Sequence, residues 1–182
     1  RPQFSPMYRR DQREGAPADI LQCLTKVNIP MSQALMARAD LIVATGGQPM
    51  VRAAYSSGTP AYGVGAGNST MIIDETANIA EAAQNTRLSK TSDFGSGCSA
   101  DGNLIIEDSI FDKLLAQLQQ EGGHIATPQQ KEMLRKAMWD AERHRTASTV
   151  AISPQQLARI AGFEIPADRK FIMVHGDGIG AQ

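Results

Sequence analysis

Cys98 is the residue of this sequence best suited to covalent chemistry. It lies in the segment 89–101, which reads Ser-Lys-Thr-Ser-Asp-Phe-Gly-Ser-Gly-Cys-Ser-Ala-Asp. Gly95 and Gly97 keep bulk away from the sulfur and allow the backbone to adopt positive φ angles. Such a loop can direct backbone N–H groups at an oxyanion that forms beside a thiolate nucleophile. A free cysteine is also a common small core residue, so the loop by itself leaves a catalytic and a packing role open.

Two glycine-containing segments are candidates for binding a phosphate. Thr45, Gly46 and Gly47 follow a short apolar run, and Pro49 stands where the first turn of a helix is expected. The orphan N–H groups and the dipole at such a helix start attract an anion. The second segment, 63–67, alternates glycine with other residues but lacks the G-x-G-x-x-G spacing of the common dinucleotide motif. Taken alone, each segment is more consistent with ordinary turn glycines.

The remaining nucleophiles and metal-ligand residue types give no second site. His124, His144 and His175 are scattered, and we expect none of them to have a Cys, Asp or Glu partner at metal-ligand spacing. We therefore predict no metal site. Cys23 lies beside an apolar run without glycine, which indicates packing. A cysteine hydrolase would need a His/Asp partner for Cys98, and the scattered histidines give that hypothesis little support.

The elements that must position these residues alternate between strands and helices, which predicts an α/β fold. The apolar run 41–44 suits a strand covered on both faces, and a helix from Pro49 to 57 should end at Gly58. A strand within 59–65 would complete a parallel β–α–β unit. Asp74 is the expected N-cap of the helix 76–88. Further strands are predicted at 71–73, 104–106, 150–152 and 170–174, and further helices at 31–39, 109–121, 129–143 and 154–161.

Composition excludes several classes of protein. The chain has 182 residues, of which 42% are hydrophobic and 20% charged, with a net charge of −1. These values suit a soluble protein with a real core and argue against a nucleic-acid or membrane-surface binder. The two cysteines form no disulfide framework, so a cytoplasmic location is expected. No apolar run is long enough to predict a membrane span.

Several segments together resemble a known family. The segments 39–50 and 51–68 carry the strongest resemblance, with Thr-Gly-Gly-Gln-Pro-Met in the first and Gly-Val-Gly-Ala-Gly-Asn at the end of the second. The similarity continues through 73–77, 89–91 and Cys98-Ser99. These segments resemble the CoA-acylating branch of the aldehyde dehydrogenase superfamily, which acts on acetaldehyde, succinate semialdehyde and sulfoacetaldehyde.

The resemblance implies a fold and a division into domains. We expect an aldehyde dehydrogenase-like fragment, with a partial Rossmann-type parallel-sheet domain followed by a partial α/β catalytic domain. Residues 1–69 would be the C-terminal part of the NAD(P)-binding domain. Residues 70–182 would be the N-terminal part of the catalytic domain. The segment 7–15 is shorter than the helix that relatives carry at this place, which indicates a deletion or a splice.

The resemblance also implies roles for individual residues. Cys98 matches the family's nucleophile. The cofactor, NAD or NADP, would be bound by Ser5, Pro6, Thr45, Gly46, Gly47, Met50, Gly65, Ala66 and Gly67. Coenzyme A would be the co-substrate, the substrate would be a small aldehyde, and the protein would form a homo-oligomer. No nucleic-acid or membrane partner is implied.

The implied reaction passes through a thiohemiacetal and a thioester on Cys98, with CoA taking the acyl group. Hydrolytic members carry a water-activating glutamate before the glycine pair, whereas this sequence has Tyr62, Gly63 and Val64 there. Without that base a thiol acceptor makes physical sense. The alternative is a catalytically silent fragment that binds a nucleotide or a partner. Unpaired sheet edges should also make the chain poorly soluble or self-associating.

Overall fold

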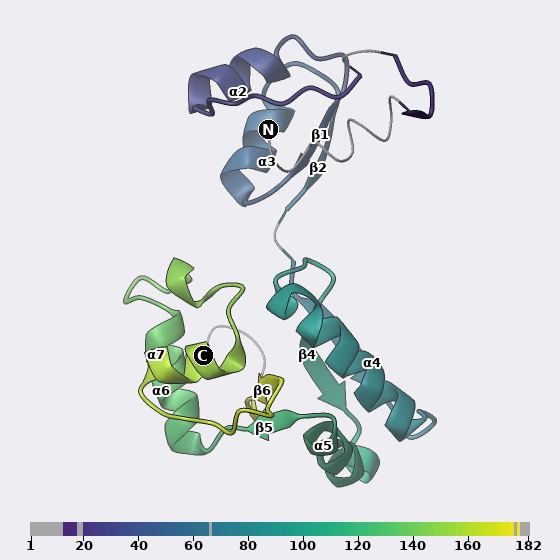
Figure 1. The fold of residues 1–182 in the computed structure, drawn as a ribbon, viewed down its shortest axis with the longest axis vertical. Helices are drawn as coiled ribbons and strands as arrows, with labels where there is room; N and C mark the ends of the chain where they lie inside the picture. The colour runs from purple at the N-terminus through teal and green to yellow at the C-terminus, as the bar shows by residue number, and fades with distance from the viewer. Residues whose placement is uncertain (1–12, 18–19, 66, 177, 179–182) are drawn as a thin grey trace. The chain divides into compact units, whose positions relative to one another are not determined.

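A computed structural model describes residues 13–17, 20–65, 67–176 and 178, and its ribbon is shown in Figure 1. The chain divides into two compact units, Arg1–Ala66 and Gly67–Gln182. All the paired strands of the described residues are parallel and occur in three two-stranded sheets. The predicted α/β class is confirmed, because each of the first two sheets is formed by strands joined through a helix.

The first unit is built on a β–α–β crossover. Its elements are α2 (Ile29–Met36), β1 (Ile42–Thr45), α3 (Gln48–Tyr55) and β2 (Ala61–Val64). The strands β1 and β2 pair in parallel from Ile42 opposite Ala61 to Thr45 opposite Val64, as predicted. Gly58 adopts a φ of 83° beyond the end of α3, which is the left-handed conformation that glycine takes without steric cost.

The core of the first unit is small. Ile42, Ala44 and Ala54 are buried, and Met36 packs against them from α2. Val43 projects to the other face of β1 and is 74% exposed. The prediction that this strand is covered on both faces is therefore wrong, because α3 packs on one face and the described residues leave the other uncovered.

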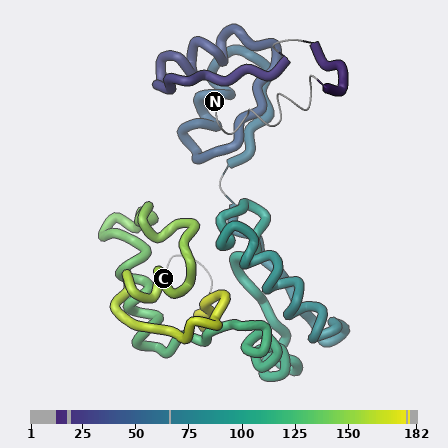
Figure 2. Tube along the Cα trace, viewed as in Figure 1, coloured from purple at the N-terminus to yellow at the C-terminus, as the bar shows by residue number. Residues whose placement is uncertain are grey.

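The second unit begins with another parallel crossover, which can be followed in the tube of Figure 2. Its elements are β3 (Ser69–Ile73), α4 (Ile79–Thr91), η1 (Ser92–Gly95), β4 (Asp101–Ile106), η2 (Asp108–Ile110) and α5 (Phe111–Gln120). The helix α4 begins later than predicted. Its N-cap is Asn78, whose side chain accepts from the N–H of Glu81, while the Asp74 carboxylate instead accepts from the N–H and hydroxyl of Thr76.

A single core holds this crossover together. Ile73, Ala83, Ile110, Leu114, Leu118 and Phe171 form the buried cluster. Leu114 and Leu118 lie on the inner side of α5 as the helical spacing predicts, and both are almost fully buried. The salt bridge from Arg87 to Glu121, at 2.6 Å, adds a polar link between α4 and the end of α5.

The rest of the second unit contains β5 (Gly123–Ile125), α6 (Pro128–Met138), η3 (Ala147–Thr149), α7 (Pro154–Ala161) and β6 (Phe171–Met173). The helices α6 and α7 begin with capping boxes at Thr127 and Ser153. Three features differ from the predictions here. Residues 150–152 are no strand, since Ala151 adopts a φ of 54°, and β5 was not foreseen. The helix α6 also ends at Met138 because Trp139 is extended and bridges to Arg145.

Apolar side chains remain exposed in both units. Val43 and Tyr62 are examples in the first, and the register pair Ile72–Ile105 is exposed on one face of the β3–β4 sheet. Self-association of the chain therefore stays a prediction that these faces support. Among the helices of the described residues, none combines the length and the apolar character that crossing a membrane requires.

Candidate active site

The predicted nucleotide-binding residues of the first unit gather at the carboxyl end of β1 and β2. Thr45 is the last residue of β1, and the N–H of Gly46 continues the ladder by donating to the Val64 carbonyl over 3.0 Å. Gly65 follows β2 on the same edge, and a Cβ built on it would lie 3.6 Å from Nε2 of the Gln48 side chain. Ligands of parallel α/β sheets bind at this edge.

The start of α3 provides the donors at this edge. Gly47 is the N-cap and accepts from the N–H of Met50 over 3.0 Å, while Pro49 has no N–H to satisfy. Within the described residues, the N–H groups of Gly47 and Gln48 have no protein acceptor, as is usual at a helix start. The two donors and the helix dipole therefore fit an anionic group such as a pyrophosphate.

Met50 restricts the same turn. A Cβ at Gly46 would lie only 2.9 Å from its sulfur, so a side chain at position 46 would require the flexible end of Met50 to move. Ser5, Pro6 and Ala66, which the sequence also implicates, fall outside the described residues. Their proposed role in cofactor binding stays a prediction.

Cys98 belongs to the second unit and is exposed. It lies in a turn between η1 and β4 that is closed by a hydrogen bond from the Ala100 N–H to the Gly97 carbonyl at 3.0 Å. The central residues of this turn are Cys98 and Ser99, whose N–H groups take no part in the closing bond. The exposure of Cys98 therefore argues against a role in core packing.

The segment before Cys98 has an unusual backbone. Asp93, Phe94 and Gly95 have consecutive φ angles of 47°, 51° and 70°. Only the third is a glycine, so two residues with side chains occupy the left-handed region. The hydroxyl of Ser96 donates to the Asp93 carboxylate over 2.7 Å and stabilises this reversal of the chain.

Two further neighbours of the loop were not identified from the sequence as functional. Asn68 packs against Gly102, where any Cβ would collide with the Asn68 amide oxygen. This contact brings the segment that starts with Gly67 beside the strand that follows Cys98. The second neighbour is the last turn of α4, whose Ser89 hydroxyl accepts from the N–H of Asp101 over 3.0 Å. No sequence periodicity links residues twelve positions apart in this way.

Lys90 adds charge to the surroundings of the loop. Burial lowers the pKa of its ammonium from the ordinary lysine value, and Arg145 acts in the same direction, whereas the carboxylate of Asp101 raises it. Asp101 is itself buried, with 8% of its surface exposed. A basic and an acidic residue therefore flank the segment that carries Cys98.

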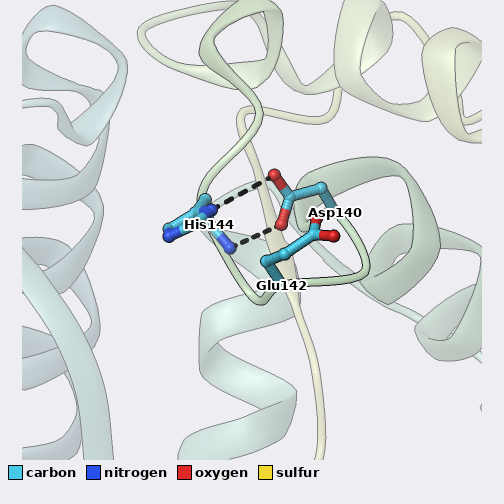
Figure 3. A group of neighbouring side chains, drawn as sticks. All are labelled: Asp140, Glu142 and His144. Atoms are coloured by element: carbon cyan, nitrogen blue, oxygen red, sulfur yellow. Dashed lines mark hydrogen bonds and ion pairs between the residues drawn. The ribbon is translucent and has the colours of Figure 1, made fainter.

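A separate group of ligand types lies in the turn after α6 (Figure 3). Asp140, Glu142 and His144 place one ligand atom each within 4.8 Å of the others, so the expectation that the histidines lack acidic partners is wrong for His144. All three are exposed. The Asp140 carboxylate accepts from the backbone N–H of His144 at 2.7 Å, and it lies 3.5 Å from Nδ1 of the His144 ring. These contacts stabilise the turn, in which Arg143 has a φ of 63°.

Comparison with known proteins identifies what this architecture is similar to. Residues 9–163 match the profile described as the aldehyde dehydrogenase family. Over 169 residues the chain is 36% identical to a sulfoacetaldehyde dehydrogenase of Acholeplasma sp. The aligned region covers 91% of this chain and 35% of that protein.

Solved structures agree with the sequence comparison. An acetylating aldehyde dehydrogenase from Geobacillus thermoglucosidasius superimposes with a TM-score of 0.89 at 38% identity, over 96% of this chain and 39% of that one. A propionaldehyde dehydrogenase of Rhodopseudomonas palustris with bound propionyl-CoA gives a TM-score of 0.80 at 29% identity, over 92% and 38% of the respective chains. The chain thus spans between a third and two-fifths of the length of these proteins.

Proposed function

This chain belongs to the aldehyde dehydrogenase family, and on that premise we propose that it carries the nucleophile of a CoA-acylating aldehyde dehydrogenase. The reaction converts an aldehyde, CoA and NAD(P)+ into an acyl-CoA and NAD(P)H. The observation that carries the proposal is the exposed Cys98, held in a tight turn beside free backbone donors. The names of the similar proteins support the CoA-acylating type.

The residues of the turn support nucleophilic attack at a carbonyl. The Cys98 thiolate adds to the aldehyde carbon, and the oxygen becomes an oxyanion in the resulting thiohemiacetal. The Gly97–Ala100 hydrogen bond leaves the N–H groups of Cys98 and Ser99 available to stabilise that charge. Backbone donors fixed in a turn need little reorganisation during the reaction, which is what makes them effective.

The first unit has groups that fit the nucleotide. The N–H groups of Gly47 and Gln48, with the glycines at 46 and 65, would hold the pyrophosphate of NAD or NADP at the start of α3. When bound, the nicotinamide accepts the hydride that the thiohemiacetal loses. We accordingly assign residues 1–69 to the nucleotide-binding domain and 70–182 to the catalytic domain, with Ser5, Pro6, Ala66 and Gly67 as further contacts.

The distribution of carboxylates favours CoA over water as the acyl acceptor. No Asp or Glu occurs between Asp40 and Asp74, a stretch that includes the glycine segment 63–67. In the loop itself, Asp93 accepts a hydrogen bond from Ser96. The water-activating glutamate of hydrolytic relatives therefore has no counterpart in this stretch, and a thiol nucleophile needs less activation than water. Sulfoacetaldehyde, acetaldehyde and succinate semialdehyde are the aldehydes that we propose as substrates.

Reduced-nucleotide oxidation in the presence of acyl-CoA thioesters tests the proposal. The assay follows the absorbance of NADH or NADPH with a panel that contains acetyl-, succinyl- and sulfoacetyl-CoA. We expect turnover that is abolished by Cys98→Ala and retained by Cys23→Ala, the matched control at the other exposed cysteine. Nucleotide binding without any Cys98-dependent turnover would instead support the silent binding fragment.

A further inference from the structure

The last turn of α4 contacts both ends of the loop that carries Cys98. At the far end, the N–H of Asp101 donates to the Ser89 hydroxyl over 3.0 Å. At the near end, Gly95 lies against Lys90, because a Cβ at Gly95 would be 3.1 Å from the Lys90 carbonyl oxygen and 3.2 Å from its Cε. Adjacent residues of one helix thus bracket the loop.

Lys90 and Asp101 also carry opposite charges. Burial lowers the pKa of the Lys90 ammonium, and the carboxylate of Asp101, which is 8% exposed, acts in the opposite direction. The aliphatic part of Lys90 lies against Gly95, so Lys90 supports the near end of the loop while Ser89 holds the far end. A shorter residue at position 90 would remove the contact with Gly95.

The backbone between the two contacts requires such support. Asp93 and Phe94 both have positive φ angles, and a left-handed conformation is sterically unfavourable for a residue with a Cβ. Conformations of this kind persist only where the surroundings fix them. The exposed Phe94 has no part in the buried cluster, so the contacts at the ends of the loop add to the Ser96–Asp93 hydrogen bond within it.

We propose that Ser89 and Lys90 are positioning residues that hold the Cys98 loop in its reactive geometry. The function of Cys98 as nucleophile rests on the activity proposed above, whereas the anchoring of the loop rests on the contacts alone. Neither residue touches the reacting atoms. Their effect is to fix where the sulfur lies relative to the backbone donors of the turn.

Amide hydrogen exchange of the 182-residue chain tests the anchoring directly. Ser89→Ala and Lys90→Ala should each speed the exchange of the Asp101 amide and of the loop peptide 93–102 by about fivefold, the equivalent of one hydrogen bond. Ser89→Thr and Lys90→Arg, which keep the hydroxyl and the cation, should restore protection. Ser109→Ala and Lys113→Ala are matched controls on exposed positions outside the loop. Trp139 fluorescence verifies that each variant is folded.

The rate at which an acyl-CoA thioester acylates Cys98 tests the positioning. We expect this rate to fall about tenfold in Ser89→Ala and Lys90→Ala and to recover in the conservative variants. Alkylation of the exposed Cys23 by iodoacetamide serves as the internal reference and should not change. Unchanged exchange at Asp101, or faster exchange with acylation of Cys98 at the wild-type rate, overturns the inference. If wild-type Cys98 is not acylated at all, the proposed function fails, while the exchange data still decide whether the two residues hold the loop.

Discussion

The Ser89 hydroxyl accepts a hydrogen bond of 3.0 Å from the backbone N–H of Asp101, which ties the end of α4 to the start of β4. The two residues are the first and last of the segment in which Cys98 lies. The loop is therefore closed by a side-chain-to-backbone bond, and its conformation depends on a helix that also contributes to the core through Ala83.

The stability of the second unit should depend on Leu118. Its side chain is 1% exposed in the cluster between α4 and α5, and truncating a buried leucine leaves a cavity. We expect Leu118→Ala to lower the free energy of unfolding by about 2–5 kcal/mol. Urea unfolding followed by Trp139 fluorescence measures the change. Leu88→Ala, at a position 51% exposed, is the control and should lie within about 0.5 kcal/mol of wild type.

Gly63 in β2 should not accept a side chain. An added Cβ would lie 2.7 Å from the Val51 Cγ1 and 2.8 Å from the Tyr55 Cε2, so α3 would have to move away from the strand. Gly63→Ala is expected to destabilise the first unit by about 1–3 kcal/mol. Hydrogen exchange of the α3 amides measures this loss. Gly176→Ala, where no atom lies within 4 Å of the added carbon, should have no effect, and equal effects at both sites would refute the packing argument.

At Phe94, in contrast to Gly63, we expect a substitution to stabilise the chain, because its backbone is left-handed. Phe94→Gly removes the steric cost of a φ of 51° and should raise the free energy of unfolding by about 0.5–1 kcal/mol. Ala116→Gly, on the exposed side of α5, should instead lower it by about 1 kcal/mol. Thermal unfolding of both variants provides the comparison. A similar loss in both would mean that Phe94 is not strained.

The lowered pKa of Lys90 should make the free energy of unfolding depend on pH in the alkaline range. Burial lowers the pKa of its ammonium in the folded chain below the value of about 10.4 that it has when unfolded. Between those values the unfolded chain binds more protons, so this residue makes folding more favourable as the pH rises toward 10.4. Urea unfolding from about pH 8 to pH 10 should show this slope in the difference between wild type and Lys90→Met. A constant difference would contradict the assigned pKa direction.

The parts of the fold that sequence predicts best are those with strong local signals. The apolar run ending at Ala44, the following glycines and Pro49 predict the β1–α3 junction, and parallel pairing with β2 follows from the length of the connection. Ser153 and Pro154 likewise mark the start of α7, and Gly162, with a φ of 92°, marks its end.

Other parts depend on contacts that no local pattern reveals. The strand β5 starts at Gly123 and has only three residues, so its local sequence resembles that of a turn. Its strand conformation is fixed by pairing with β6. Val150 and Ile152 have strand-forming side chains, but Ala151 takes a left-handed φ of 54° that interrupts any ladder. Helix α4 is capped by Asn78 because Asp74 is engaged with Thr76.

The candidate site divides in the same way. Glycines around Cys98 predict a loop but leave the burial of the sulfur open, and in the structure Cys98 is exposed. The anchoring of that loop by Ser89 and Lys90 was not predictable, because it joins residues that only the β3–α4–β4 crossover brings together. The roles of Cys98 and of the glycine segments in catalysis and cofactor binding remain predictions.

Mass spectrometry of the chain after incubation with an acyl-CoA thioester tests the central claim most directly. Transfer of the acyl group from the CoA sulfur to the Cys98 sulfur forms one thioester, releases CoA thiol and needs no nicotinamide. We expect a single acyl adduct on the peptide that contains Cys98, present in Cys23→Ala and absent in Cys98→Ala. An adduct on Cys23 alone, or none with any thioester of the panel, would contradict the assignment of Cys98 as the nucleophile.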